Sequence, residues 1–357
     1  MAIDWTKSMK QTFSFYKVNA DTWMDEEKQD YIGTCTITRD ADKDVIESAS
    51  IGGIPIEDEC YIRIYLEVEQ GIENAKVCLG TFIVQTPGID HDGKHSSTTM
   101  DAYSPLLELN ENPMDLGFYV RSGTNVIDAV CAIASNGMRG PVVETVGDSE
   151  VVEDYVAETN DTRLTFVKSL AESVGCHIEL DNISRVMFAP DTVTEATVPV
   201  WEYTDDNSSI LYPNISVKRD IYKIPNVVEI FYSNGLYSRV VNDDPNSPIS
   251  TVNRGREIIY RETEPNITGD VTQEILDDYA VRKLREKSAL EYTLTYSHGY
   301  CPVRLHDVVL LNYRRAGIIN RKAKVKTQVI ECKTGCKVNE TAVYTDYLWN
   351  PKREVKQ

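Results

Sequence analysis

The chain has 357 residues, 41% hydrophobic and 26% charged, which is typical of a folded protein with roughly two to four domains. No run approaches the roughly 18 apolar residues of a transmembrane helix, and the first residues, MAIDWTKSMKQTF, lack the apolar core of a signal peptide, so we expect a soluble protein made in the cytosol. The net charge of −19 argues against a nucleic-acid-binding surface, because phosphate binding needs clustered lysine and arginine. An acidic surface would instead repel a polyanion.

Residues 1–112 are predicted to form a first small β-barrel. Alternating or β-branched residues indicate four strands, at Thr34–Thr38, Tyr61–Val68, Gly80–Thr86 and Ser97–Ala102. Turns are expected at 52–53 and 92–93. Aromatic residues near the start are expected in the core or in subunit contacts: Trp5, Phe13, Phe15, Tyr16 and Trp23.

Residues 113–197 are predicted to form a compact α/β module. Thr124 is the expected N-cap of a helix whose apolar face is Val126, Ile127, Val130, Cys131 and Ala134. A second helix is expected from Thr162, with Gly175 as its terminator. The segment CHIELDNISRVMFAP is predicted to be a hairpin that turns at Asp181 and Asn182.

Residues 198–349 are predicted to form a second small β-barrel, followed by a mobile tail over 350–357. Asn234-Gly235 is a strong hairpin signal between strands at Val227–Tyr232 and Leu236–Val241. A turn-rich loop leads to a strand at Glu257–Arg261 and then to a helix over 270–290 that Asp270 is expected to cap. The apolar helix positions are Ile275, Leu276, Tyr279, Ala280 and Leu284. After Tyr292 a period of two predicts strands through Leu294 and Tyr296, Val303 and Leu305, and Val325, Thr327 and Val329.

One basic stretch departs from the acidic balance of the chain. Residues 313–330 contain no acid and carry Arg314, Arg315, Arg321, Lys322, Lys324 and Lys326. We interpret this stretch as a solvated hairpin or a contact with an acidic neighbouring subunit, and we disfavour nucleic-acid binding.

Cysteine and histidine spacing does not predict a metal site. The eight cysteines, most of them in or beside apolar runs, are expected to be small buried hydrophobes: Cys35, Cys60, Cys78, Cys131, Cys176, Cys301, Cys332 and Cys336. His298, Cys301 and His306 lie close in sequence without a fourth ligand at a recognised spacing. For them, and for Cys332 and Cys336, we expect structural roles, with a disulfide or a shared zinc as the alternative. His91 and His95 are expected to be solvated on a turn, and His177 to be partly buried.

No catalytic motif is present, and no cofactor site is predicted. Acidic pairs such as Glu57 with Glu59, or Asp205 with Asp206, are expected by chance in a chain with 56 acids. The sequence lacks H-E-x-x-H, G-x-S-x-G, P-loop and G-x-G-x-x-G patterns. We therefore predict no catalytic, cofactor-binding or metal-binding residue, and no enzyme activity.

The order of several segments resembles a known family. The segments are LGTFIVQTP, MDAYSPLLELNENP, WEYTDDNSSILYP, IPNVVEIFYS, NDDPNSPISTVNRGREI and SHGYCPVRLHDVVLLNY. Together they resemble the tail hub proteins of tailed phages and phage-derived particles, the baseplate hub or tail-tip proteins related to late control protein D. The likeness extends from Trp5 to Trp349. The chain departs from it at His306-Asp307, where many relatives have Gly-Asp.

The resemblance implies a mainly β fold with an α/β insert, assembled as a homotrimer. Its two barrels per chain would form a pseudo-hexameric ring between a six-fold tail tube and a three-fold tip. The implied partners are the tail tube or distal tail protein and a tail spike or fibre protein, with the tape measure protein as a further candidate. DNA would pass through the ring without specific binding, and no membrane insertion is expected. The protein would be made in the bacterial host cytoplasm and reside at the virion tail tip.

Two other functions remain open. Aromatic residues such as Trp201, Tyr232 and Tyr237 could stack on sugars in a receptor- or glycan-binding tip protein. A tip-associated peptidoglycan hydrolase is the third hypothesis, although the chain ends soon after the second predicted barrel and we expect no further enzyme domain.

Overall fold

The computed structural model describes residues 3–29, 33–53, 58–94, 96–232, 235–265, 267 and 271–351. The chain divides into two compact units, Met1–Ile215 with Thr295–Ala342, and Ser216–Leu294 with Val343–Gln357. The predicted mainly β fold is confirmed, with a large antiparallel sheet and small helices. The two barrels and the domain ranges 1–112, 113–197 and 198–349 remain predictions. Both units draw on segments distant in sequence, so neither matches one predicted range.

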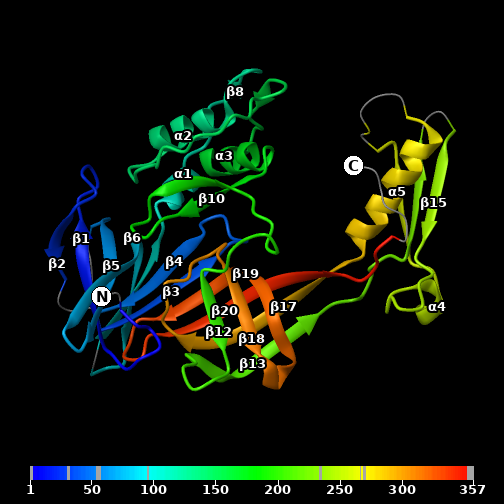
Figure 1. Ribbon diagram of the computed structural model, residues 1–357. Helices are drawn as coiled ribbons and strands as arrows, with labels where there is room; N and C mark the ends of the chain where they lie inside the picture. The colour runs from blue at the N-terminus through cyan, green and yellow to red at the C-terminus, as the bar shows by residue number, and fades with distance from the viewer. Residues whose placement is uncertain are drawn as a thin grey trace. The chain divides into compact units, whose positions relative to one another are not determined.

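A large, mainly antiparallel sheet dominates the first unit (Figure 1). Its strands are β1 (Lys10–Val18), β2 (Asp25–Lys28), β3 (Thr34–Asp40), β4 (Glu47–Gly52), β5 (Tyr61–Gln70), β6 (Glu73–His91), β7 (Ser96–Tyr103), β12 (Trp201–Thr204), β13 (Leu211–Arg219), β17 (Ala289–Gly299), β18 (Val308–Tyr313), β19 (Ile318–Glu331) and β20 (Lys337–Tyr347). The strand order is β13-β17-β20-β19-β3-β4-β7-β6-β5-β1-β2, with β18 paired to β19 and to β12. The pairing of β12 with β18 is parallel. Strands β13, β17 and β20 continue into the second unit.

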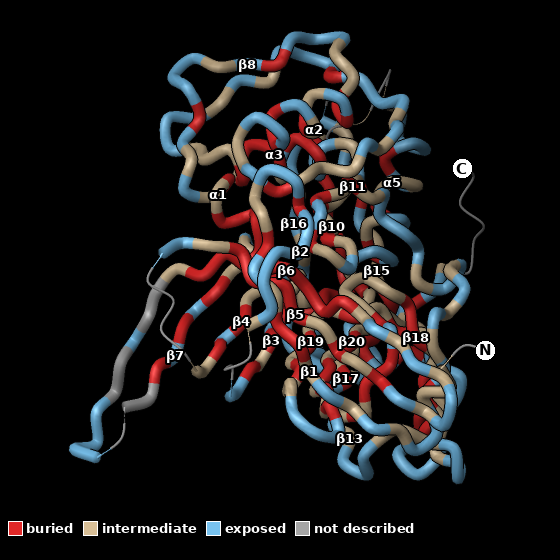
Figure 2. The backbone as a smooth tube through the Cα atoms, turned by 90° about the vertical axis from the view of Figure 1, so that its left-hand side faces the viewer, coloured by how far each residue is buried: buried red, intermediate tan, exposed pale blue. Residues whose placement is uncertain are grey.

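The pairing of β3 with β19 joins the strands of the two predicted barrels into one sheet. Thr36 lies opposite Glu331, and Ile37 lies opposite Ile330. Because side chains alternate along a strand, Cys35, Ile37 and Arg39 point to the same face, and all three are buried. Figure 2 shows buried residues along these central strands. The sheet core therefore continues across the joint.

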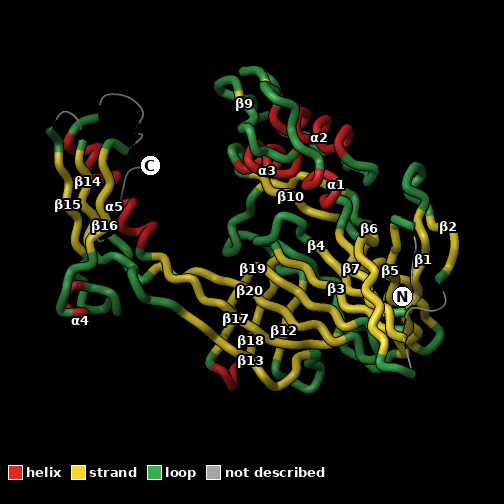
Figure 3. Tube along the Cα trace, turned by 180° about the vertical axis from the view of Figure 1, so that it is seen from behind, coloured by secondary structure: helices red, strands yellow, loops and turns green. Residues whose placement is uncertain are grey.

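The region of the predicted α/β module contains helices and short strands within the first unit. Its elements are α1 (Leu106–Glu111), β8 (Tyr119–Val120), α2 (Val126–Gly137), β9 (Tyr155–Val156), α3 (Arg163–Glu172), β10 (Cys176–Leu180) and β11 (Val186–Pro190). Figure 3 shows the three helices gathered beside β10. Helix faces and the β10–β11 hairpin share one core, which includes Val130, Leu164, Val167 and Phe188.

The predicted helix ends and hairpin of this module are confirmed, except for one N-cap. Thr162 caps α3 by accepting a hydrogen bond from the Thr165 amide, and Gly175 follows the helix at φ 68°, a left-handed conformation that glycine adopts easily. The predicted cap of α2, Thr124, is wrong. Asn125 is the cap, because its side chain accepts from the Asp128 amide at 3.1 Å.

The second unit contains a small sheet packed on a helix. Its elements are β14 (Val227–Phe231), β15 (Tyr237–Val241), α4 (Thr251–Arg254), β16 (Ile259–Thr263) and α5 (Gln273–Lys287). The order is β15-β14-β16, with β14 and β16 parallel. One face of β14, through Val228 and Ile230, packs against Leu276, Ala280 and Leu284 of α5. This packing explains why those three helix positions are fully buried.

Several predicted boundaries are corrected. Helix α5 covers 273–287 rather than 270–290, and Thr272 caps it by accepting from the Ile275 amide. The predicted cap Asp270 and the hairpin residue Asn234 lie outside the described residues. The strand predicted at Glu257–Arg261 begins two residues later, at Ile259. The predicted strand through Val303 and Leu305 is wrong, because the chain turns there before β18. Residues 352–357 of the predicted tail are not described.

Candidate functional site

A buried polar cluster lies where β17, β19 and β20 meet in the first unit. Glu340 is fully buried and accepts hydrogen bonds from the Tyr296 hydroxyl at 2.5 Å and from Gln328 Nε2 at 2.7 Å. His298 Nε2 lies 3.4 Å from the same carboxylate and 3.1 Å from the Tyr203 hydroxyl. The carboxylate therefore has several close donors and no contact with solvent.

His298 and Glu340 form an ion pair. Burial alone would lower the pKa of His298, but its interactions with Cys301 and Glu340 outweigh burial and raise that pKa to about 10. Burial would likewise raise the pKa of Glu340, yet the hydrogen bond and charge of His298 hold it below the ordinary value. The Nδ1 atom of His298 donates to the Gly299 carbonyl at 2.7 Å. Both ring nitrogens are thus committed to structural partners.

The polar contacts continue from this cluster across the β3–β19 joint. Gln328 Oε1 accepts from Arg39 Nη1 at 3.0 Å, and Arg39 Nε lies 3.1 Å from Glu47 Oε1. The same Glu47 oxygen accepts from Arg304 Nη2 at 2.6 Å. Arg39 and Glu47 are only 1% and 2% exposed. Glu47 therefore lies between two guanidinium groups and is itself almost completely buried.

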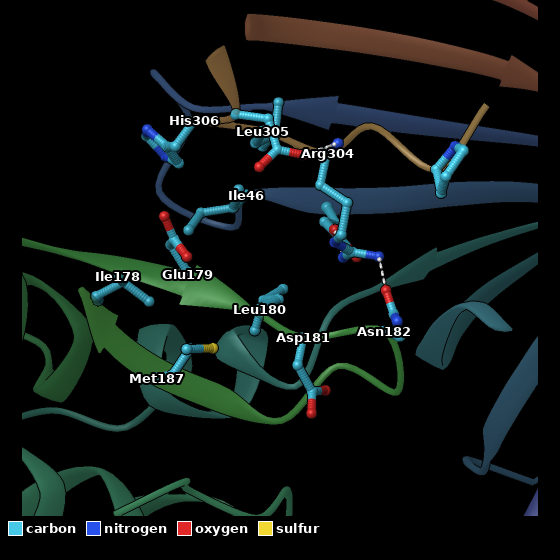
Figure 4. Close-up of a pocket in the computed structure, with 13 residues that line it drawn as sticks. Ile46, Ile178, Glu179, Leu180, Asp181, Asn182, Met187, Arg304, Leu305 and His306 are labelled. Carbon is cyan, nitrogen blue, oxygen red and sulfur yellow. Dashed lines mark hydrogen bonds and ion pairs between the residues drawn. The ribbon is translucent and has the colours of Figure 1, made fainter. Parts of the chain in front are cut away.

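Arg304 also lines a pocket of about 270 Å³, which lies between the β10–β11 hairpin and the turn before β18. Figure 4 shows Arg304 reaching from the turn to Asn182, where its Nη1 donates to the side-chain oxygen at 3.3 Å. The lining residues are Ile46, Glu47, Ile178, Glu179, Leu180, Asp181, Asn182, Met187, Pro302, Arg304, Leu305, His306 and Asp307. Ile46 and Leu305 also pack against the core of the α/β module. The pocket therefore lies at the joint between the module and the sheet.

Two histidines meet at the edge of this pocket. The rings of His177 and His306 are 4.1 Å apart between centroids. His177 contacts Glu179 Oε1 through Nε2 and Asp191 Oδ1 through Nδ1, each at 2.8 Å. Burial, followed by the charge of His177, lowers the pKa of His306 to about 4. His306 is therefore neutral near pH 7.

The turn at His306 has the backbone conformation that glycine favours. His306 has φ 66°, and its amide donates to the Val325 carbonyl at 3.0 Å. Asp307 accepts from the Arg304 amide at 2.7 Å and closes the turn. A left-handed residue other than glycine is strained, and histidine is among the residues that tolerate this conformation best. His306, which stands where the resembled family often has glycine, thus adopts a backbone conformation that suits glycine.

The acidic groups around the pocket already have structural partners. Asp181 contacts Arg185 Nε at 2.6 Å, and Glu179 contacts His177. Within the described ranges, no group of three or more His, Cys, Asp or Glu side chains could hold a metal ion. The arrangement can fix the hairpin against the sheet, because Arg304 contacts both Asn182 and Glu47.

The other candidates from the sequence are dispersed. His298 and Cys301 come together, but His306 lies in the separate pocket with His177. Cys332 and Cys336 are free thiols, as are the other six cysteines. His91 is exposed, whereas His95 and Glu57 lie outside the described residues.

The remaining acidic and basic candidates lie on the surface. Glu59 pairs with Arg139 at 2.6 Å, and Asp206 accepts from Ser208. In the basic stretch, Lys322 donates to the Glu195 and Thr197 carbonyls, while Arg314 and Arg315 are exposed on a short 3-10 turn, η1 (Arg314–Ala316).

Sequence reasoning missed the charged and polar members of the buried cluster: Arg39, Glu47, Gln328 and Glu340. Strand alternation gave a signal for Glu47 in β4, for Arg39 and for Glu340. Arg39 continues the inward alternation of Cys35 and Ile37, and Glu340 lies between the buried Val338 and Ala342 at the same spacing. A charge at an inward strand position predicts a buried partner.

The comparisons with known proteins concern the fold. No protein-family model and no curated protein sequence matches the chain. Among solved structures, the tail protein from Neisseria meningitidis MC58 is similar with a TM-score of 0.63 and 12% identity, over 93% of this chain and 97% of that chain. The 43 kDa tail protein of prophage MuSo2 from Shewanella oneidensis is similar with a TM-score of 0.63 and 12% identity, over 93% and 98%.

A third similar structure is a chain of the Francisella PdpA-VgrG complex, with a TM-score of 0.58 and 9% identity, over 98% of this chain and 60% of that chain. The resemblance to phage tail proteins is therefore confirmed at the level of the fold. None of the helices in the described ranges is long and apolar enough to cross a membrane.

Proposed function

We propose that this chain is the tail hub of a phage or phage-derived particle. It is a homotrimer that ends the tail tube, adapts six-fold to three-fold symmetry, and anchors the tail spike or fibre while leaving a channel for DNA. The observation that carries the proposal is the fold shared with two tail proteins over 93% of this chain. In this role the protein resides at the virion tail tip and is made in the host cytoplasm.

The sheet edges support assembly into a ring. Strands β13 and β2 end the strand order, so each has a sheet neighbour on one side only within the described residues. Tyr212 and Val217 of β13 are 40% and 42% exposed. An uncovered edge with exposed apolar side chains invites pairing with another chain. Neighbouring copies, the tube or distal tail protein, and the spike or fibre protein are the partners that we propose for such surfaces.

The polar groups support a structural role rather than catalysis. Glu340 is sealed from solvent, and the carboxylates at the pocket are engaged with Arg39, Arg304, His177 and Arg185. The net charge of −19 suits a channel that DNA passes through without adhering. These features favour a scaffold in which charges hold parts of the chain together.

Particles purified after loss of this chain test the proposal. We expect tubes without a tip, and complementation with the intact gene product should restore tips. In complemented particles, antibody label should lie where the tube ends, and averaging there should show three-fold symmetry. A complete tip on particles that lack the chain would refute the proposal. Solution mass alone does not test it, because a hub can be monomeric before assembly.

A receptor- or glycan-binding function is the second candidate, and one observation favours it. Phe231 and Tyr237 are 41% and 42% exposed, and their ring centroids are 4.9 Å apart. Such a pair offers a surface on which a sugar ring can stack. Trp201 and Tyr232 are partly buried and less suited to this role. Loss of glycan binding in Tyr237→Ala, with binding retained in Tyr222→Ala, would support this function; no binding by the intact chain would eliminate it.

A further inference from the structure

Two cysteines far apart in sequence lie opposite each other at the end of the β3–β19 joint. The register that pairs Thr36 with Glu331 places Cys35 opposite Cys332. The Cys332 amide donates to the Cys35 carbonyl at 2.9 Å, so the pairing extends to these two residues. Cys35 and Ile37 belong to the buried face, and Cys332 packs against the same core cluster.

The geometry of this pair suits a disulfide. Directly opposite residues that share a ladder hydrogen bond have Cα atoms about 5.5 Å apart. Disulfides join residues whose Cα atoms are about 4.4–6.8 Å apart. Both thiols are free, with Cys35 buried and Cys332 partly exposed. Cys332 is the more exposed residue of the two, so oxidation is expected to begin there.

We propose that Cys35 and Cys332 are an oxidation site at which a disulfide oxidant, such as glutathione disulfide, forms a covalent bond between β3 and β19. The Cys332 thiolate attacks one sulfur of glutathione disulfide and releases one glutathione thiolate. The Cys35 thiolate then attacks the Cys332 sulfur of the mixed disulfide and releases the second. The protein loses two electrons and two protons, and one molecule of glutathione disulfide becomes two of glutathione.

The neighbouring Cys336 is the competing partner, and the structure disfavours it. Cys336 lies fully buried in the tight turn after β19, where its amide donates to the Lys333 carbonyl. The C-x3-C spacing suggests a pair with Cys332, whereas the strand register directs Cys332 toward Cys35. The sequence left a disulfide between Cys332 and Cys336 as an alternative, and the strand register instead favours Cys332 with Cys35.

The reaction is expected to be slow and to accelerate with pH. The hydrogen bond with Cys35 and burial raise the pKa of Cys332 above its ordinary value, so its thiolate is scarce near pH 7. The pair therefore suits a lasting cross-link rather than a rapid sensor. The chemistry does not depend on the proposed function, although a particle that leaves a reducing cytosol would meet oxidising conditions.

Peptide mapping of the intact chain tests the proposal. The protein, purified with reductant, is incubated with glutathione disulfide at pH 8.5, alkylated after denaturation and digested with trypsin without reduction. Trypsin cleaves after Lys333 and so separates Cys332 from Cys336. We expect a linked pair of peptides containing Cys35 and Cys332, a fall in alkylated cysteines from eight to six, and a rise in Tm of roughly 5–10 °C that reductant reverses.

Matched variants separate the two partners of Cys332. Cys35→Ser should abolish the linked peptide and the rise in Tm, whereas Cys336→Ser and the control Cys60→Ser should retain both. A Cys332–Cys336 link in the natural chain would overturn the proposal. So would a glutathione adduct that persists on Cys332, or eight thiols that still react after oxidation. Because mapping of the natural chain decides the outcome, the test does not depend on how the variants fold.

Discussion

Replacing Glu47 by glutamine tests whether the buried charge cluster holds the first unit together. Glu47 is 2% exposed, and its Oε1 atom contacts Arg39 Nε at 3.1 Å and Arg304 Nη2 at 2.6 Å. Glutamine has the same shape and keeps an oxygen that can accept neutral hydrogen bonds. The substitution therefore removes the negative charge and leaves two cations beside each other.

The expected loss of stability is large because Arg39 is 1% exposed and cannot regain hydration. Removing one partner of a buried ion pair costs about 3–5 kcal/mol. Since glutamine preserves an acceptor, we expect a value near the lower limit, about 3 kcal/mol. Glu59→Gln is the matched control, because Glu59 is 49% exposed and pairs with Arg139, which also contacts Glu108. An exposed pair of this kind contributes about 0–1 kcal/mol.

Urea unfolding followed by tryptophan fluorescence measures the difference. Trp23 is buried in the first unit and reports on it. We expect the midpoint of Glu47→Gln to fall by roughly 1 M or more with an unchanged slope, and that of Glu59→Gln to stay near the natural value. Adding Arg304→Met to Glu47→Gln should recover part of the loss, because it removes one unpaired cation. Equal midpoints for the two glutamine variants would refute the reasoning.

Three further predictions concern histidines and a helix cap. The pKa of His298 is raised from 6.5 to about 10, so its stabilising charge is fully present below about pH 6.5 and is lost as the pH rises toward 10. His298→Asn should flatten the dependence of Tm on pH in this range. An unchanged slope would contradict the ion pair. The pKa of His306 is lowered from 6.5 to about 4, so its contribution is present above pH 6.5 and lost as the pH falls toward 4. His306→Gly should remove this acid sensitivity and relieve about 1 kcal/mol of left-handed strain, whereas unaltered acid unfolding would exclude His306 as its source. Asn125→Ala should cost about 1 kcal/mol in urea unfolding and Thr124→Ala less than about 0.5 kcal/mol, and the reverse order would restore Thr124 as the cap.

Local features of the fold could be predicted because neighbouring residues determine them. Thr162 and Gly175 mark the ends of the α3 region through a hydroxyl acceptor and a left-handed backbone. The β10–β11 hairpin likewise forms where the alternating pattern meets Asp181. The two-residue period at Val303 and Leu305 was too short to distinguish a strand from a turn. Leu305 is partly buried there because it packs against the module.

The candidate site could not be predicted, because its partners come from distant segments. Glu47 and Arg304 are separated by 257 positions, and the alternation of β4 indicates only that Glu47 points inward. Composition gave no indication either, since acids are abundant in this chain. Only the pairing of β3 with β19 brings Arg39 to Gln328. The chemistry of the site is therefore a consequence of the sheet order.

This dependence also gives the buried polar groups a role in selecting the sheet register. Around Ile37 and Ile330, apolar side chains alone would tolerate a shift of two residues, because the same faces would still meet the core. Such a shift would separate Arg39 from Gln328, which face each other in the native register. Arg39 would lose this buried hydrogen bond, and a buried donor left without an acceptor costs about 1–3 kcal/mol, more when the donor is charged. The polar contacts therefore penalise the alternative pairings that the apolar core would accept, and they do so at the strand pair that joins the two halves of the sheet.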